Sequence, residues 1–357
     1  MDLARIAELY PPPPDGLAYL NTATYGLAPV TAQQTLRSAL DDWTRGIADW
    51  TTFENQADRA RALFATLIHA SPEEVALLPA ASFALATALA SAPRRSEIVL
   101  SPDDHPSLTI PAQAHAQNLR LRWSPFDSLA DAATKNTHLI ACSHVRHDNG
   151  LLADIPSIAA AAAENAAAVY LDATQSAGAL AIDVQRLRVD YLACAAYKWL
   201  SCPRGVAFLW VAPHRLEQLQ PLAPSRRSTT APLLAAPIDQ SAFSSSAAKL
   251  DVSLAWFSWA AAPHCLEAVL SIDEQTRERT TVGLAQRLAV ALGSTPPQSG
   301  ICAVEVADRT RAKRDLERHK VKATTREAWV RLSPHFYNSA ADVDRAVAAL
   351  APHVRCG

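Results

Sequence analysis

The sequence predicts an α/β protein with a mostly parallel seven-stranded sheet, helices on both faces and a smaller C-terminal α+β domain. The main observation is that helical segments alternate with short apolar runs between about residues 56 and 215. Such alternation favours parallel strands that are buried on both faces. The apolar runs are 75–78, 97–100, 119–123, 137–142, 168–171, 191–195 and 206–211.

The first part of the chain predicts an irregular arm over residues 1–30. The run from Pro11 to Pro14 must be extended, because each proline fixes φ and keeps the preceding residue out of the helical region. A helix is expected at 31–45, with Thr31 as its cap. Further helices are expected near 56–69, 82–91, 106–117, 156–166 and 214–219.

The last third of the chain has a different pattern. Residues 221–247 are rich in Pro, Ser and Ala, which predicts a connection with a mobile loop. A long helical segment at 251–291 precedes strands near 301–306 and 328–333 and a helix at 340–350. We therefore expect an arm at 1–30, a large domain at 31–235 and a small domain at 236–357.

Composition narrows the class of protein. The 357 residues are 49% hydrophobic, enough for two cores. The net charge of −2 gives no reason to expect a nucleic-acid or acidic-membrane partner. Six cysteines without a C-x-x-C pair indicate a reducing cytoplasm, and no metal site is predicted. Neither a signal peptide nor an apolar run of about 18 residues appears, so no membrane span is expected.

The densest chemical signal lies between residues 170 and 211. Asp172 follows the buried run 168–171, at the strand end where ligands of parallel sheets bind. Lys198 follows the run 191–195, and partial desolvation between aromatic neighbours would lower its pKa. A lysine that forms a Schiff base and a carboxylate that pairs with a ring nitrogen are what pyridoxal 5'-phosphate requires. A lone lysine would instead be interpreted as an ordinary salt-bridged group.

Two motifs in this region resemble a known family. The segments D-A-T-Q-S-A-G (172–178) and Y-K-W-L-S-C-P-R-G (197–205) are similar to those of class V aminotransferases, pyridoxal-phosphate enzymes of fold type I. This family includes cysteine desulfurases, isopenicillin N epimerase, kynureninase and carbon–sulfur lyases. The resemblance extends from residue 19 to residue 347. It implies the fold type I architecture and a homodimer with shared active sites.

The resemblance also implies cofactor contacts. Ala81 and Ser82 open a helix after a strand, and free N–H groups at a helix start bind phosphate; a plain serine cap is the alternative. His105 resembles the histidine that stacks on the cofactor ring; an ordinary exposed histidine in a loop is the alternative. Gln175 resembles the residue that binds the ring hydroxyl. Tyr197 replaces a commoner histidine and can still reach the phosphate through its hydroxyl group.

Substrate contacts follow from the same resemblance. Arg331 matches the arginine that holds the substrate α-carboxylate, to which a guanidinium fork is suited; a surface charge on an edge strand is the alternative. Thr24 and Tyr25 of the arm are expected at the substrate mouth. Ser253 stands where relatives contact the phosphate of the partner subunit. His147 occupies a position where many relatives carry an asparagine, and its role stays open.

The reaction is narrowed by a missing residue type. Cysteine desulfurases carry a mobile cysteine in the loop before the carboxylate-binding arginine, whereas the segment 319–333 contains none. The nearest cysteine, Cys302, is interpreted as core packing. The pattern is closer to isopenicillin N epimerase-like and carbon–sulfur lyase branches, which include enzymes of lincosamide antibiotic pathways. The preferred hypothesis is β-elimination from a cysteine S-conjugate in secondary metabolism, with Lys198 as the base.

Three alternatives remain at this point. The first is decarboxylation coupled to oxidative deamination of such a conjugate. The second is transamination or epimerisation of a bulky amino acid. The third is a catalytically silent scaffold, against which the joint presence of Asp172, Gln175, Lys198 and Arg331 argues.

Overall fold

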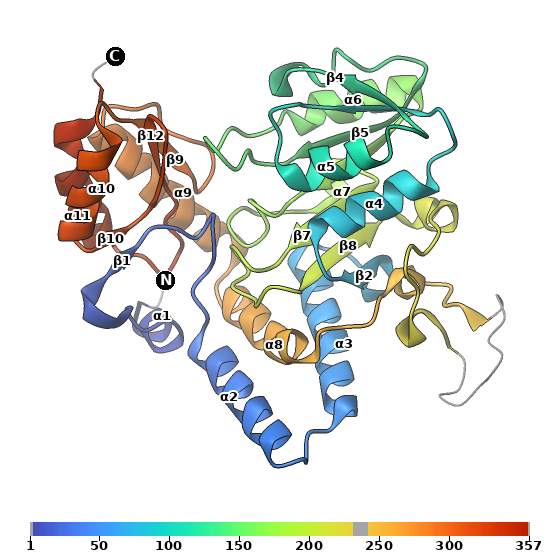
Figure 1. The fold of residues 1–357 in the computed structure, drawn as a ribbon, viewed down its shortest axis with the longest axis horizontal. Coiled ribbons are helices and arrows are strands. Elements are labelled where there is room, and N and C mark those ends of the chain that lie inside the picture. Colours follow the sequence, from blue (N-terminus) through green and yellow to red (C-terminus); the bar gives the residue numbers. More distant parts are fainter. Residues whose placement is uncertain (1–2, 231–241, 356–357) are drawn as a thin grey trace.

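The computed structural model describes residues 3–230 and 242–355 and contains the expected seven-stranded sheet (Figure 1). The strand order is β2-β8-β7-β6-β5-β3-β4. Only β8 runs antiparallel to its neighbours, so the prediction of a mostly parallel sheet is confirmed. The strands are β2 (Val75–Leu78), β3 (Glu97–Leu100), β4 (Arg120–Trp123), β5 (Thr137–Ser143), β6 (Ala168–Asp172), β7 (Tyr191–Ala195) and β8 (Ala207–Val211).

Both faces of this sheet are covered, because alternate side chains of each central strand enter different cores. In β6, Val169 and Leu171 face one core, whereas Ala168 and Tyr170 face the other. The first core also receives α3 (Trp50–Leu67), α6 (Ile155–Asn165) and α8 (Trp256–Leu270). The second core receives α4 (Ala81–Ser91) and α5 (Pro106–Ala114).

A smaller α+β unit lies beside the sheet (Figure 1). Its three antiparallel strands are ordered β11 (Thr324–Arg326), β12 (Trp329–Leu332) and β9 (Cys302–Glu305). The strands predicted near 301–306 and 328–333 are thus present as β9 and β12. Its helices are α9 (Glu274–Ala291), α10 (Arg309–Arg318) and α11 (Ala340–Leu350). Throughout the described ranges, no helix has both the length and the apolar character needed to cross a bilayer.

The N-terminal arm is more regular than expected. It contains α1 (Leu3–Leu9) and β1 (Ala18–Tyr19), which pairs in parallel with β10 (Val321–Lys322). Apolar residues explain the difference: Ile6 joins the core of the large sheet, and Leu20 is fully buried in the core of the small unit. The arm therefore connects the two units.

Helix boundaries differ where capping groups were misjudged. The predicted Thr31 cap is wrong, because α2 (Val30–Thr44) already begins after Pro29 and has no side-chain cap. The helix predicted from residue 56 begins at Trp50, because the Asp49 carboxylate accepts from the amide of Thr51 at 3.0 Å.

The predicted single helical segment at 251–291 is two helices, α8 and α9. Asp273 starts the second by accepting from the amide of Thr276 at 2.8 Å. The helix predicted at 214–219 is a 3-10 helix, Pro213–Gln218, and a short α7 (Val184–Leu187) was not predicted.

The predicted domain boundary at residues 235 and 236 lies outside the described residues, as does part of the loop predicted at 221–247. Beyond this gap, α8 still packs on α2 and α3, and Trp259 joins the core of the large sheet. In contrast, Leu288 of α9 joins the core of the small unit. The change from one core to the other therefore occurs between α8 and α9.

Candidate active site

A cavity of about 610 Å³ lies at the carboxyl ends of the central strands. Sheet register explains its position, because Ser143 at the end of β5 pairs with Asp172 at the end of β6, which pairs with Ala193 of β7. Such strand ends are where ligands of α/β sheets bind. The predicted residues that line the cavity are Ala81, Ser82, His105, His147, Asp172, Gln175, Tyr197 and Lys198.

Lys198 is almost completely buried, with 4% of its surface exposed. Burial lowers the pKa of its amine to about 8, and the nearby Asp172 carboxylate offsets part of this effect. Hydrogen bonds fix the turn that carries Lys198 on both sides of this residue. The amide of Gly26 donates to the carbonyl of Tyr197 at 3.0 Å, and His335 Nε2 donates to the carbonyl of Trp199 at 2.8 Å. The site thus holds an amine with a much larger uncharged fraction near neutral pH than an ordinary lysine has.

Asp172 presents its carboxylate to the same cavity and is also 4% exposed. Its Oδ1 accepts from the amide of Thr174 at 2.9 Å, and its Oδ2 accepts from the hydroxyl of Ser107 at 3.0 Å. One bond to each oxygen fixes the plane of the carboxylate. The structure therefore brings Lys198 and Asp172 together, as their strand-end positions predict.

The first turn of α4 forms another wall. The N-cap residue of α4 is Ala80, whose side chain cannot accept a hydrogen bond. The alternative that Ser82 is a plain helix cap is therefore wrong. The first amide of this turn that bonds within the helix is that of Phe83, which donates to the carbonyl of Ala80 at 3.1 Å. The preceding N–H groups of Ala81 and Ser82 are suited to an anion.

Two histidines meet at the cavity. His105 occupies the N-cap position of α5, where its Nδ1 lies 3.1 Å from the amide nitrogen of Ser107. Its ring contacts that of His147 edge to face, with 4.8 Å between centroids. Burial lowers the pKa of each imidazole to about 4, so both are neutral at pH 7. The buried Nδ1 of His147 has no hydrogen-bond partner among the described residues, so it is available to a ligand.

Gln175 connects the arm to the lysine turn. Its Nε2 donates to the carbonyl of Ala23 at 3.0 Å, and its Oε1 accepts from Trp199 Nε1 at 2.9 Å. Tyr197 lines the cavity between the ring of Tyr25, at 5.8 Å between centroids, and the guanidinium of Arg204, at 5.0 Å. The cofactor contacts of Gln175 and Tyr197 remain predictions.

Arg331 lies behind His147 rather than on the cavity wall. It belongs to β12, the central strand of the small sheet, and is 3% exposed, so the alternative of a surface charge on an edge strand is wrong. Its Nη2 donates to Thr24 Oγ1 at 2.7 Å and its Nη1 donates to the carbonyl of His147, while its buried Nε has no partner in the part of the chain that the structure describes. Burial, together with Arg326, lowers the pKa of this guanidinium to about 10.

Three other predicted residues lie outside the 610 Å³ cavity. Thr24 contacts Arg331, and Tyr25 is 40% exposed beside Tyr197. Ser253 is exposed and precedes α8, so its contact with the partner subunit stays a prediction.

Several lining residues were not predicted as site residues. Ser143 ends β5 beside Asp172, and Arg204 belongs to the same motif, 197–205, as Lys198. An apolar wall comes from one face of α4 and one face of α5. Helical spacing could have predicted it, because residues three to four positions apart share a face. Its members are Phe83, Ala86, Ile110, Pro111 and Ala114.

The chain is similar in sequence and fold to several known proteins. Residues 36–346 match the model of a family described as aminotransferase class-V. An uncharacterized aminotransferase of Bacillus subtilis (strain 168), YcbU, is 28% identical over 328 residues, 85% of either chain. Isopenicillin N epimerase of Streptomyces clavuligerus is 31% identical over 180 residues, 46% of this chain and 45% of that protein. The complex of the cystine C–S lyase C-DES with its product cysteine persulfide has a similar fold, with a TM-score of 0.86 at 20% identity over 96% of this chain and 99% of that chain.

Proposed function

The chain belongs to the class-V aminotransferase family, whose enzymes use pyridoxal 5'-phosphate, and from this premise we propose that it catalyses β-elimination from a cysteine S-conjugate. The conjugate and one water give a thiol, pyruvate and ammonia. The observation that carries this proposal is a buried amine of lowered pKa in a cavity with an apolar wall and no thiol among its described lining residues.

The cavity fits the cofactor. Lys198 supplies the amine for its aldehyde, and Asp172 supplies a fixed carboxylate for its ring nitrogen. The unbonded N–H groups of Ala81 and Ser82 suit its phosphate. The neutral His105 ring suits the face of the pyridine. When bound, this cofactor withdraws electrons from the substrate Cα and so acidifies the proton there.

The chain's own residues supply the base and the anchor. We assign removal of the Cα proton to Lys198 Nζ, since an amine with a pKa of about 8 accepts a proton near neutral pH. We assign the α-carboxylate to Arg331, whose buried Nε has no protein partner. The thiolate then leaves Cβ with the electrons of the C–S bond. Further contacts that we propose are Gln175 with the ring hydroxyl, Tyr197 with the phosphate, and Thr24 and Tyr25 at the substrate mouth.

Two features favour a bulky S-substituent over free cysteine. The wall between α4 and α5 is apolar and includes Phe83, Ile110 and Ala114, which suit a hydrophobic group. A desulfurase needs a thiol to take the sulfur. The five described cysteines are free and buried, and none of them lines the cavity. The likeness to isopenicillin N epimerase supports a place in secondary metabolism.

A substrate comparison tests this proposal. The protein, loaded with pyridoxal phosphate, is incubated with S-benzyl-L-cysteine, and pyruvate and thiol are measured against time. We expect equal amounts of both products, and none from Lys198→Ala. Carbon dioxide with an aldehyde, formed with consumption of O2, would instead establish decarboxylation coupled to oxidative deamination. Alanine from free L-cysteine, with sulfide released in the presence of a reducing thiol, would establish a desulfurase.

The relatives provide the second candidate, transamination or epimerisation of a bulky amino acid. The observation in its favour is the 28% identity to a Bacillus subtilis aminotransferase over 85% of the chain. Amino transfer to pyruvate, or formation of the D-isomer without thiol release, would identify these activities. A protein that neither binds the cofactor nor turns over substrate would be the silent scaffold.

We further propose a cytoplasmic homodimer in which Ser253 reaches the phosphate of the partner site. The exposure of Ser253 outside its own cavity supports this contact, and the free cysteines suit a reducing compartment. A monomeric mass in solution would exclude the shared site.

A further inference from the structure

Ser107 lies between two groups of the site, His105 and Asp172. Its hydroxyl donates to Asp172 Oδ2 at 3.0 Å, and the same oxygen lies 2.8 Å from His105 Nδ1. Its backbone amide also points at His105 Nδ1, at 3.1 Å. One residue thus makes three polar contacts to the predicted ring-stacking histidine and the predicted ring-pairing carboxylate.

The available protons cannot satisfy all three contacts. An ionised carboxylate only accepts, so the single hydroxyl proton of Ser107 belongs to Asp172. The 2.8 Å contact with His105 then carries a proton only if that proton sits on Nδ1. If Nδ1 carries the proton, the amide N–H of Ser107 faces this N–H group at 3.1 Å, whereas if Nδ1 instead accepts from the Ser107 amide, two lone pairs face each other at 2.8 Å. The carboxylate charge favours the first arrangement, because both dipoles of the chain then point toward it.

We propose that Ser107 is a positioning residue that couples the tautomer of His105 to the charge of Asp172. The chain runs from His105 Nδ1–H to Ser107 Oγ, and from Ser107 O–H to Asp172 Oδ2. Neutral His105 then keeps a lone pair on Nε2, whereas loss of the chain moves the proton to Nε2 without any change of net charge. This proposal does not depend on which substrate bond is broken.

The surroundings hold the three groups in register. The amide of His105 donates to Asp104 Oδ1 at 2.6 Å, and Asp104 also accepts from the hydroxyl and the amide of Ser143, at 2.6 and 2.8 Å. The amide of Thr174 binds the other oxygen of Asp172 at 2.9 Å. Because these bonds fix the backbone of His105 and the carboxylate of Asp172, a substitution at Ser107 is expected to change the position of the His105 proton and not the conformation of the loop.

Nitrogen-15 NMR of histidine-labelled protein tests the coupling directly, in the cofactor-free and in the loaded enzyme. The two ring nitrogens of a neutral histidine report which one carries the proton, and the signals lost in His105→Gln identify this residue. We expect the proton on Nδ1 in the wild type and in Ser107→Thr, which keeps the hydroxyl. In Ser107→Ala we expect it on Nε2, because the residue 107 amide is then the only partner left at Nδ1.

A matched control lies at the start of α6, where the hydroxyl of Ser157 donates to Asp154 Oδ2 at 2.6 Å. Ser157→Ala removes a similar bond outside the cavity and should leave the His105 signals unchanged. A proton on Nε2 in the wild type would overturn the proposal even if Ser107→Ala failed to fold. An unchanged tautomer in folded Ser107→Ala would overturn it as well. Loss of pyruvate formation alone would bear only on the proposed reaction.

Discussion

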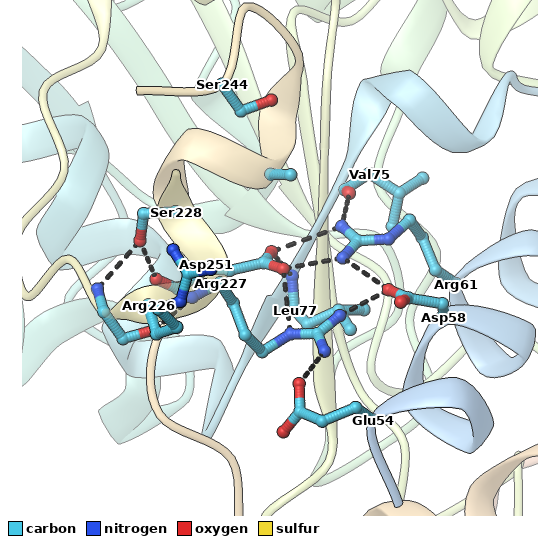
Figure 2. A network of polar contacts seen from close by, with 12 residues as sticks. Glu54, Asp58, Arg61, Val75, Leu77, Arg226, Arg227, Ser228, Ser244 and Asp251 are labelled. Atoms are coloured by element: carbon cyan, nitrogen blue, oxygen red, sulfur yellow. Dashed lines mark hydrogen bonds and ion pairs between the residues drawn. The ribbon is translucent and has the colours of Figure 1, made fainter. Parts of the chain in front are cut away.

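Two arginine sites in the interior of this protein have opposite surroundings. In the first, Arg61 and Arg227 converge on the fully buried Asp251, whose Oδ2 accepts from them at 2.6 and 3.3 Å (Figure 2). Asp58 and Glu54 supply further carboxylates. Burial acts to lower the pKa of Arg227, but these carboxylates outweigh it and the net pKa is raised.

In the second site, the acceptors of Arg331 among the described residues are all uncharged: the hydroxyls of Thr24 and Thr324 and the carbonyl of His147. Its pKa falls to about 10 because burial is not compensated by a contacting carboxylate. A buried cation with matched anions stabilises the fold through its network. A buried cation without a neighbouring anion costs stability, and such residues are typical of sites that receive an anionic ligand. The contrast supports a structural role for Arg61 and Arg227 and the proposed substrate-binding role for Arg331.

Removal of the shared carboxylate should give the largest effect. Asp251→Ala leaves Arg61 and Arg227 without their common partner and removes the acceptor of the Leu77 amide, now at 2.8 Å. We expect the free energy of unfolding to fall by about 3–5 kcal/mol, measured by urea denaturation. Asp344→Ala, which breaks the exposed pair with Arg287, should change it by less than about 1 kcal/mol. Equal losses in the two variants would contradict the assignment of a structural role.

Neutralisation of Arg331 should have the opposite effect, with little change in the free energy of unfolding but a large loss of kcat/KM. Arg331→Gln removes an uncompensated charge, so the free energy of unfolding should stay within about 1 kcal/mol of the wild type or rise. In contrast, kcat/KM should fall about 100- to 1,000-fold, because the substrate carboxylate loses its cation. Arg326→Gln removes a nearby exposed charge and should have little effect on kcat/KM. A loss of several kcal/mol in Arg331→Gln with an unchanged kcat/KM would make this arginine structural too.

Lys198 sharpens the comparison, because unlike the arginines it can give up its charge. Its pKa of about 8 in the folded chain lies below its ordinary value of 10.5, so the unfolded chain binds more protons between these two pH values. Stability of the cofactor-free protein should therefore rise with pH across this window, by ~1 kcal/mol between pH 8 and 9. Denaturation at several pH values checks this, with Lys198→Met as the reference. An identical pH dependence in both proteins would refute it.

The large sheet could be predicted because its strands, apart from the exposed edge strand β4, are apolar runs that tertiary packing buries. The element missed in the small unit, α10, contains mostly charged residues, and only Ala312 and Leu316 of it are buried. The strands β10 and β11 are too short to leave a pattern and exist through pairing with β1 and β12. Local sequence therefore predicts the large sheet better than the small unit.

The same distinction applies within the site. Asp172 and Lys198 could be placed together because the strands that precede them are adjacent and parallel. The position of Arg331 behind His147 could not, since that contact depends on how the two units pack. The role of Ser107 was also out of reach, because it depends on distances of about 3 Å between segments 65 residues apart.

The pairing of the arm with the small unit also sets an order in time. Thr24 and Arg331 are 307 residues apart, so the ribosome completes the arm long before its partners exist. Ala18 and Leu20 can be buried only after the strands of the small unit, including β10, have been synthesised. The large sheet, with its more local connections, is free to form earlier. Synthesis at least as far as Arg331 must therefore precede the contact between Thr24 and Arg331, which is the proposed carboxylate-binding end of the site.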